Sequence, residues 1–473
     1  MEDKILIKNA LAIITCNHQN EIHYNSDLYI EGPEIIKIGK NLEAGDARII
    51  DGKDMFVYPG LINTHHHFFQ AFVRNNVWLD WTKLDVMDWI KQIYEFFKLI
   101  DSDSIYYTSL SSMSELIKHG CTTAFDHQYC YPKHAGKLLV DRQMEAAELL
   151  GMRFHAGRGT NTLPRSRGSI MPDEMVETTD EFLKDCDRLI SKYHQYEKFG
   201  MKRIVVAPCQ PVNCYPETFS ESVALARSKN VSMHTHLGEG EDPIIVARYG
   251  KRSLKWCEDL GFVGPDVWYA HGWDLQDEEI DLLAKLKTGV SHCPAPAFLG
   301  GFNVLNIPRF YAKNVPLGLG VDGHASNDNS NLMEIIRTTY LLQCHAAGQR
   351  DLPIPPPQEF LKMATAGGAK LLNRDDIGIL EEGKAADMFL LDTRKLEYVG
   401  TLHDPASLPV KVGISEPVTM TIINGKVVYE DGHLNGINES VIFDKAQETC
   451  KKVIYSDSNY KLCVEGFKKQ DEV

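Results

Sequence analysis

The sequence has no long hydrophobic run, no C-x-x-C pair and no excess of basic residues. Because no apolar stretch reaches the roughly 20 residues that cross a bilayer, we expect no membrane span. The amino terminus, Met1 to Ile5, lacks the basic and then apolar regions of a secretory signal. The 11 cysteines are scattered and odd in number, which favours reduced thiols over a disulfide framework. These absences together predict a cytoplasmic protein.

The charge balance also excludes some partners. The chain has 50 basic and 65 acidic residues and a net charge of -15, so nucleic acids and anionic membranes would repel it. Its 473 residues exceed the size at which one core usually stops growing. No internal repeat or low-complexity segment interrupts the chain. We therefore expect one large barrel, or two domains, acting on a small molecule.

Both ends of the chain have the short β-branched and apolar runs of strands. The first ~55 residues contain Ile5-Leu6-Ile7 and Ile35-Ile36-Lys37-Ile38, for example. Near the other end, the dipeptide Asn424-Gly425 between two such runs indicates a β-hairpin. Since strands need partners to bury a face, we predict one small β-sandwich built from residues 1–57 and 379–473.

Between these ends, strand-like segments alternate with amphipathic helical stretches, such as Asp141 to Leu150 and Asp277 to Leu286. Eight strand-helix units over ~300 residues predict a closed (β/α)₈ TIM barrel, an α/β fold, spanning residues 58–378. The expected strands are Val57 to Asn63, Thr122 to Asp126, Arg153 to Ala156, Ile204 to Pro208, Val231 to Thr235, Asp266 to Ala270, Gly289 to His292 and Leu317 to Val321. Such a barrel carries its chemistry at the carboxyl ends of its strands.

Histidines concentrate at those predicted strand ends. Every end except the fourth carries one, and more than half of the 18 histidines lie in these short stretches. In the triplet after the first strand, His65 and His67 point to one face and His66 to the other, because side chains alternate along a strand. Two imidazoles alone could merely cap loop groups. Further histidines at the other strand ends favour a metal site.

A mononuclear metal site follows from the ligand types. His65, His67, His236 and Asp322 would supply three nitrogens and one oxygen, a set that suits zinc, with ferrous iron as the alternative. A binuclear site needs a bridging anionic group, whereas the fourth strand ends in Ala207-Pro208-Cys209. We therefore expect one divalent ion per chain, with a position left open for water.

The ion would lower the pKa of water and make hydroxide available, so proton carriers are needed nearby. Glu239 follows His236 by three residues, which suits a general acid-base carboxylate. His271 could orient the hydroxide. The remaining strand-end histidines are expected to support neighbouring groups or to pack in the core; they include His66, His127, His155 and His292.

These motifs resemble the amidohydrolase superfamily, in its mononuclear deaminase subtype. The segments that carry the resemblance are Pro59 to His67, His236-Leu237-Gly238-Glu239, Ala270-His271, Gly320-Val321-Asp322-Gly323 and Gly378 to Asp387. Within the superfamily the chain is most similar to the 8-oxoguanine deaminase branch, beside chlorotriazine hydrolases and pterin deaminases. The resemblance implies the same barrel and β-sandwich, and a homo-oligomer.

The resemblance also implies a reaction. Hydroxide would attack the ring carbon that bears an exocyclic amine, Glu239 would protonate the adjacent ring nitrogen, and Asp322 would pass the water proton to the departing ammonia. The expected reaction is deamination of 8-oxoguanine to urate. The alternatives are dechlorination of a chlorotriazine, deamination of a pterin or opening of a cyclic amide. A non-catalytic relative is disfavoured because Glu239 and Asp322 are both present.

Two departures from the family pattern concern the substrate. The family's seventh-strand motif ends in Ser-Asn, whereas this chain has Pro296-Ala297, which removes a polar pair. A serine usual in the branch is replaced by His324. The candidates for recognising the ring are an amide, a stacking surface, a fork of donors and this titratable group, namely Gln70, Trp89, Arg158 and His324.

Overall fold

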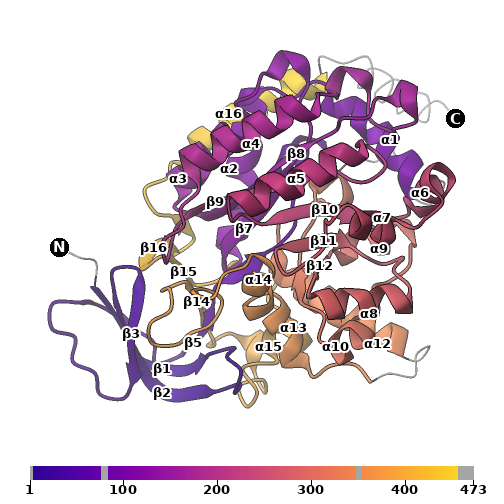
Figure 1. Ribbon diagram of the computed structural model, residues 1–473. Coiled ribbons are helices and arrows are strands. Elements are labelled where there is room, and N and C mark those ends of the chain that lie inside the picture. Colours follow the sequence, from indigo (N-terminus) through magenta and orange to yellow (C-terminus); the bar gives the residue numbers. More distant parts are fainter. Residues whose placement is uncertain (1–3, 76–83, 348–352, 456–473) are drawn as a thin grey trace, which may run out of the picture.

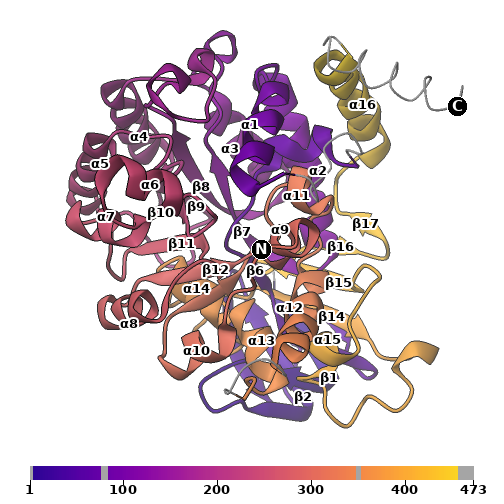
Figure 2. The same ribbon diagram turned by 90° about the vertical axis from the view of Figure 1, so that its right-hand side faces the viewer.

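The computed structural model describes residues 4–75, 84–347 and 353–455. Eight parallel strands close into a barrel, and strands from both termini form a second sheet (Figures 1 and 2). Both parts of the predicted fold are thus confirmed. The barrel strands are β6 (Leu61–Asn63), β7 (Cys121–Gln128), β8 (Arg153–Thr160), β9 (Lys202–Pro208), β10 (Met233–Leu237), β11 (Val267–His271), β12 (Gly289–His292) and β13 (Leu317–Leu319).

The single strand predicted from Val57 to Asn63 is two strands in the structure. The first of them, β5 (Met55–Pro59), pairs with strands of the terminal sheet, whereas β6 belongs to the barrel. Gly60 divides them. A Cβ on this glycine would lie 2.0 Å from Oγ1 of Thr122, so the chain can pass this close only without a side chain.

Three barrel strands, β7, β8 and β9, are longer than the sequence pattern indicated. In β8, His155 pairs with Arg203 near the start of β9, and Thr160 pairs with Pro208 at its end. His155 therefore lies at the amino end of the barrel, and the prediction that it ends its strand is wrong. The strand continues because Gly157 and Gly159, which interrupt the apolar pattern, still pair with β9, and Gly157 also pairs with β7.

Helices surround the barrel and cover its outer face (Figure 1). They include α3 and α8, close to their predicted positions. None of the described helices is long and apolar enough to cross a membrane. The helices are α1 (Val86–Phe97), α2 (Ser102–Lys118), α3 (Leu139–Leu150), α4 (Thr179–Tyr193), α5 (Pro216–Ser228), α6 (Asp242–Tyr249), α7 (Ser253–Asp259), α8 (Asp277–Leu286), α9 (Pro294–Gly300), α10 (Ile307–Ala312), α11 (His324–Asn327), α12 (Leu332–Ala347), α13 (Pro357–Met363), α14 (Ala366–Leu371), α15 (Leu408–Lys411) and α16 (Glu439–Tyr455).

The terminal sheet folds over its own core. Segments from its two ends meet, because Ala386 donates its N–H to the carbonyl of Pro33, and Gly425 donates to the carbonyl of Ala386. The predicted hairpin at Asn424-Gly425 is present, with both residues at positive φ. The sheet order is β17-β16-β15-β14-β5-β1-β2-β3 with β4 beside β1, and the strands not yet given are β1 (Lys4–Ile14), β2 (Ile22–Glu31), β3 (Glu34–Gly39), β4 (Arg48–Asp51), β14 (Met388–Asp392), β15 (Met420–Ile423), β16 (Lys426–Glu430) and β17 (His433–Leu434).

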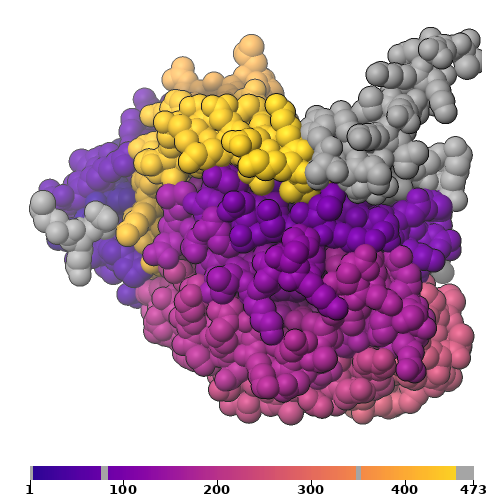
Figure 3. Space-filling model, turned by 90° about the horizontal axis from the view of Figure 1, so that it is seen from above, coloured from indigo at the N-terminus to yellow at the C-terminus, as the bar shows by residue number. Residues whose placement is uncertain are grey.

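The last described helix ties the carboxyl-terminal part of the chain to the barrel. α16 packs along α2, and Lys118 at the end of α2 forms an ion pair with Glu439 at the start of α16. Figure 3 shows this yellow segment lying across the purple surface of the earlier chain. The ten cysteines in the described part of the chain are all free, in line with the expected reduced thiols.

Large side chains fill the barrel interior below its carboxyl end. The rings of Phe125, His234 and Trp268 lie with their centroids 4.7 to 4.9 Å apart, and all three are fully buried. Such a packed interior is not a pore. It forms a rigid floor below the strand-end histidines.

Candidate metal centre and active-site cavity

Hydrogen bonds fix the tautomers of two histidines at the carboxyl end of the barrel. Nδ1 of His67 lies 3.0 Å from the carbonyl oxygen of His127, and Nδ1 of His236 lies 2.8 Å from that of Cys209. A carbonyl oxygen only accepts, so each Nδ1 carries the proton. The opposite nitrogen, Nε2, therefore holds a free lone pair in both rings.

His65 has the same tautomer, which its hydrogen bond to the imidazole of His234 fixes. Nδ1 of His234 lies 2.9 Å from the carbonyl oxygen of Trp268, so it donates there. Nε2 of His234 must then accept, and it lies 2.9 Å from Nδ1 of His65. His65 consequently keeps a lone pair on Nε2, an atom that is buried and has no hydrogen-bond partner.

These lone pairs converge on one point. The Nε2 atoms of His67 and His236 lie 3.0 Å apart, and Oδ1 of Asp322 lies 3.3 Å from Nε2 of His67 and 3.4 Å from Nε2 of His65. No hydrogen lies between these four acceptors, so their proximity is repulsive unless a cation sits among them. Three imidazoles and one carboxylate suit a divalent ion of the zinc type.

Burial keeps the imidazoles in the form that binds metal. Desolvation, followed by the neighbouring histidines, holds the pKa of His65 well below its ordinary value, and burial lowers the pKa of His236. Neutral imidazole is the form that ligates. The four predicted ligands, which lie far apart along the chain, are therefore brought together in a state that can hold a divalent ion.

Backbone strain marks two other predicted residues. His271 and Asp322 adopt positive φ values of 77° and 65°, a region that side chains other than glycine seldom occupy. Each follows or ends a barrel strand, and such strain is common at functional sites. The second oxygen of Asp322, Oδ2, accepts a hydrogen bond of 2.9 Å from the hydroxyl of Ser326. That bond holds the carboxylate in one orientation.

Glu239 lies beside this cluster. Its Oε1 is 3.3 Å from Nε2 of His271, and its Oε2 is buried without a hydrogen-bond partner. The turn that positions it is held by Glu241, whose carboxylate accepts from the backbone N–H groups of Gly238 and Glu239 at 2.9 and 2.8 Å. A Cβ on Gly238 would lie 3.0 Å from the backbone of Gly272, which explains the glycine.

The surroundings of Glu239 favour its protonated form. Burial raises the pKa of this carboxyl well above its ordinary value, and the negative charges of Asp322, Glu241 and Asp274 raise it further. A carboxylic acid that keeps its proton near neutral pH can donate that proton to a substrate. Glu239 therefore has the geometry and the protonation state expected of a general acid.

A cavity opens beside the cluster and contains two of the four residues predicted to bind the substrate, Gln70 and Trp89. Gln70 is fixed, because its Oε1 accepts the N–H of Ala325 at 3.1 Å. The cavity wall also includes Pro296, which departs from the family motif, and residues that the sequence did not single out: Val86, Ile90, Ile93, Tyr94, Tyr129, Gln210 and Ser326.

Some of these residues could have been found from the sequence. Gln210 directly follows the fourth strand end, and its Oε1 is buried in the cavity wall without a partner. The fourth strand end carries no histidine, so it gave no metal-site signal in the sequence. The apolar residues of α1 gave no such signal, because an amphipathic helix has the same pattern wherever it packs.

Arg158, predicted to contact the substrate, does not line this cavity. Its guanidinium is fully buried outside the barrel, where Glu177 lies at 2.7 Å and Asp185 of α4 at 2.7 Å. The ring of Tyr131 lies 3.7 Å below it. Successive side chains on β8 alternate between the two faces, so the direction of Arg158 depends on the register of a strand that is longer than expected.

Arg158 is instead a structural residue. Replacing it with methionine removes the charge that two buried carboxylates share, and breaking such a pair costs about 3 kcal/mol. We expect Arg158→Met to lower the melting temperature while KM of the folded fraction stays unchanged. Calorimetry and steady-state kinetics together test this, and a large rise in KM without loss of stability would restore the substrate-binding role.

His324 also lies outside the cavity wall. Its ring is buried between Arg74 and Ser330, whose hydroxyl is 2.6 Å from Nε2, and it packs against His66. Hydrogen bonds within this cluster occupy the ring, which does not line the cavity where we expect the substrate. His66 itself points away from the metal centre and lies 2.8 Å from the same hydroxyl, as the alternation along the strand predicted.

Comparisons with known proteins agree with this geometry. The amidohydrolase family profile matches residues 56–428. The hydroxydechloroatrazine ethylaminohydrolase of Pseudomonas sp. (strain ADP) is 55% identical over 441 residues, which cover 91% of this chain and 92% of that protein. The 8-oxoguanine deaminase of Pseudomonas aeruginosa is 32% identical over 454 residues, 95% of this chain and 98% of that protein.

Solved structures lead to the same family. The atrazine chlorohydrolase TrzN from Arthrobacter aurescens TC1, in complex with zinc, superimposes with a TM-score of 0.89 at 30% identity, over 94% of this chain and 100% of that one. A histidine-rich centre at the carboxyl end of the barrel accompanies this likeness. The chain belongs to the amidohydrolase family and is a metal-dependent hydrolase that acts on C–N bonds of small heterocyclic compounds.

Proposed function

We propose that this protein hydrolyses the bond between an aromatic N-heterocycle and an exocyclic amine, and that a hydroxylated s-triazine with an ethylamino group is its best substrate candidate. The relative at 55% identity is named for that type of reaction. Water adds its oxygen to the ring carbon, the C–N bond breaks, and the amine leaves with one proton of the water, while the other proton stays on the ring product. The ring keeps a hydroxyl or oxo group.

The observation that carries this proposal is the meeting of four acceptor atoms with a protonated acid. His65, His67, His236 and Asp322 would hold one divalent ion, best zinc, which when bound makes hydroxide available at neutral pH. Glu239 stands beside them with a raised pKa. The four metal ligands alone would fit a structural site as well as a catalytic one. A buried acid beside them favours a catalytic site in which protons are transferred.

Side chains of the protein would carry out the proton transfers of this reaction. Glu239 holds a proton and would deliver it to the ring nitrogen next to the reacting carbon. Asp322 would accept a proton and return it to the leaving amine, while the hydroxyl of Ser326 holds the carboxylate in place through Oδ2. His271, 3.3 Å from Glu239, would orient the attacking oxygen.

The cavity wall favours a substrate with an alkyl group. Val86, Ile90 and Ile93 of α1 and Pro296 of α9 form an apolar side, and Pro296 stands where the family pattern has a polar residue. Burying an ethyl group there gains about 0.8 kcal/mol per CH₂. The unsubstituted amine of a purine has no alkyl group to bury against these apolar residues.

Deamination of 8-oxoguanine is the second candidate. A relative with 32% identity supports it, and the amide of Gln70 remains in the cavity to bind an oxo group. Arg158, the other group expected to bind a purine oxygen, faces away from the cavity. The apolar wall and the lower sequence identity support removal of an alkylamine over deamination of 8-oxoguanine.

A substrate panel tests the proposal. We expect zinc-loaded protein to release ethylamine from an ethylamino-hydroxy-s-triazine with a higher kcat/KM than it releases ammonia from 8-oxoguanine, guanine or isoxanthopterin. Chlorinated triazines serve as the control for attack at another bond. Release of chloride or ring opening without any amine would refute an aminohydrolase, and ammonia from 8-oxoguanine as the fastest product would favour the second candidate.

The polar pair of the family motif offers a test of specificity. The double substitution Pro296→Ser with Ala297→Asn restores that pair in this chain. We expect kcat/KM for the ethylamino substrate to fall about tenfold, since a pocket contact of this size is worth 1–3 kcal/mol, while turnover of an unsubstituted amine is preserved. An equal fall in kcat/KM for both substrates would show that the apolar wall does not select for the alkyl group.

A further inference from the structure

A second cavity lies at the opposite end of the barrel from the metal centre. Its volume is about 360 Å³, and it is lined by residues that precede β9 and β10 and by the segment from Leu372 to Asp376. Arg203, in its wall, is six residues before Cys209 along β9, or about 20 Å at 3.3 Å per residue. The cavity is therefore separate from the proposed active site.

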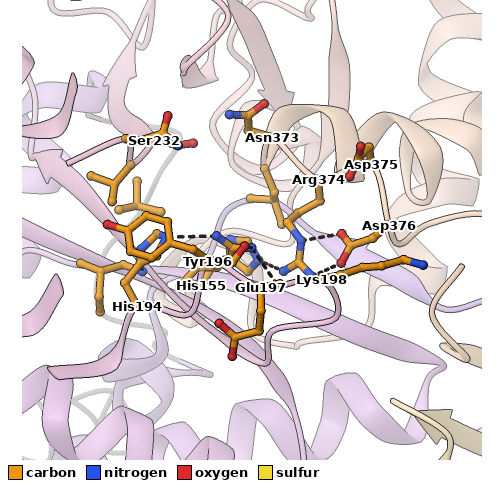
Figure 4. Close-up of a pocket in the computed structure, with 16 residues that line it drawn as sticks. His155, His194, Tyr196, Glu197, Lys198, Ser232, Asn373, Arg374, Asp375 and Asp376 are labelled. Atoms are coloured by element: carbon orange, nitrogen blue, oxygen red, sulfur yellow. Dashed lines mark hydrogen bonds and ion pairs between the residues drawn. The ribbon is translucent and has the colours of Figure 1, made fainter. Parts of the chain in front are cut away.

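One arginine in this wall is fully compensated. The guanidinium of Arg374 binds both oxygens of Asp376, at 2.7 and 2.8 Å, and also contacts His155 at 3.3 Å. In Figure 4, Asp376 lies beside Arg374 on the right, while His194 lies on the left. The carboxylate of Asp376 therefore compensates the charge of Arg374. It lies away from the side of the cavity that holds His194.

The other arginine, Arg203, lacks such a partner. Within the described ranges it forms no ion pair, and its Nε is buried without any hydrogen-bond acceptor. Its Nη2 reaches only the carbonyls of Tyr196 and Glu197, at 3.3 and 3.4 Å. The guanidinium as a whole is partly buried, and an acceptor at its unpaired side would compensate its charge.

His194 adds a second unused donor. Its Nδ1 accepts the backbone N–H of Ile204 at 3.1 Å, so the proton of the neutral ring is on Nε2. Burial and the charge of Arg203 lower the pKa of His194 to about 4, which keeps the ring neutral at pH 7. Nε2 faces Nη1 of Arg203 at 3.1 Å, so two donors point at each other.

We propose that this cavity is a binding site for a small oxyanion, a phosphate or carboxylate group, whose oxygens accept from Nη1 of Arg203 and from Nε2 of His194. An oxygen bound to both donors replaces the unfavourable donor-to-donor contact and compensates the partly buried charge. Glu197 and Asp375 also line the cavity, so a singly or doubly charged group fits better than a polyanion.

Isothermal titration of the zinc-loaded protein tests the site, with inorganic phosphate in one arm and acetate in the other at constant ionic strength. We expect the preferred anion to bind one per chain with a Kd on the order of 1 mM. Tighter binding of phosphate would indicate a phosphate monoester as the ligand, and tighter binding of acetate a carboxylate. No binding of either anion below about 50 mM would overturn the proposal.

Variants separate this site from the metal centre. Arg203→Gln should weaken binding at least about tenfold, as loss of a charged hydrogen bond does, and leave amine release unchanged. Arg227→Gln is the control, because Arg227 pairs with Asp266 on the exposed surface. Binding that persists in Arg203→Gln and inhibits turnover would mean that the anion occupies the metal centre instead.

A second variant guards against a folding defect. His194→Phe keeps a ring against Tyr196, whose centroid lies 4.4 Å away, but removes the Nε2 donor and also the Nδ1 acceptor of the Ile204 N–H. It should also weaken anion binding, and its melting temperature without anion should fall no further than the loss of that one hydrogen bond explains. Unchanged affinity in a folded His194→Phe protein would refute the role of His194 in the site.

Discussion

Glu239→Gln is expected to lower kcat by about 10³-fold, within the range that a positioned general acid contributes. Glutamine keeps the size of the side chain and its place beside His271, but it has no proton to give to a ring nitrogen. KM should change little, because the ring contacts of the cavity remain. Steady-state kinetics with the best amine substrate provides the measurement.

The pH profile sharpens this prediction. Protonated Glu239 is the active form, so activity should fall as the pH rises through its pKa, which burial raises above the ordinary value of a glutamate. The residual activity of Glu239→Gln should lack this alkaline decline. Its zinc content, measured by elemental analysis, serves as the control and should equal that of the parent. Full turnover in the variant would contradict the assignment of Glu239 as the acid.

His67→Asn is expected to remove both metal and activity. The amide nitrogen of asparagine can replace Nδ1 of His67 as donor to the carbonyl of His127, while the side chain loses the Nε2 atom that faces His236. Substitution of outer partners of a metal site costs 10- to 100-fold in metal affinity, so loss of a direct ligand should cost more than about 100-fold. Elemental analysis after dialysis measures it.

The neighbouring histidine provides a matched control. His66→Asn keeps an acceptor for the N–H of His67, which now binds Nδ1 of His66 at 2.7 Å, and loses the contact with Ser330 and the ring packing against His324 and Phe68. We expect this variant to retain one ion per chain and most of its activity. Equal metal loss in both variants would show that the triplet acts only through local folding, and two ions per parent chain would refute a mononuclear site.

The strand-end histidines were predictable because alternation along a strand is a local property. His65 and His67 had to share a face whatever the rest of the chain did. His236 and Asp322 could be added because parallel strands of one barrel all end on the same side. Neither step needed the exact length of any strand.

Arg158 and His155 show where this reasoning stops. Both lie on β8, whose real end at Thr160 is four residues beyond the predicted end at Ala156. A shift of this kind moves His155 to the other end of the barrel, and the direction of Arg158 is set by the register of the strand. The pairing of β8 with its two neighbours decides both, and that information is not in the local pattern.

The sequence by itself determined the barrel, the terminal sheet, the candidate ligand set and the class of chemistry, since periodicity and residue type follow from local chain geometry. Only the tertiary structure decided which groups face the cavity. The apolar wall from α1, the closed cluster around His324 and the uncompensated Arg203 all depend on contacts between segments far apart in the chain. Desolvation, which raises the pKa of Glu239, likewise exists only after those segments have packed.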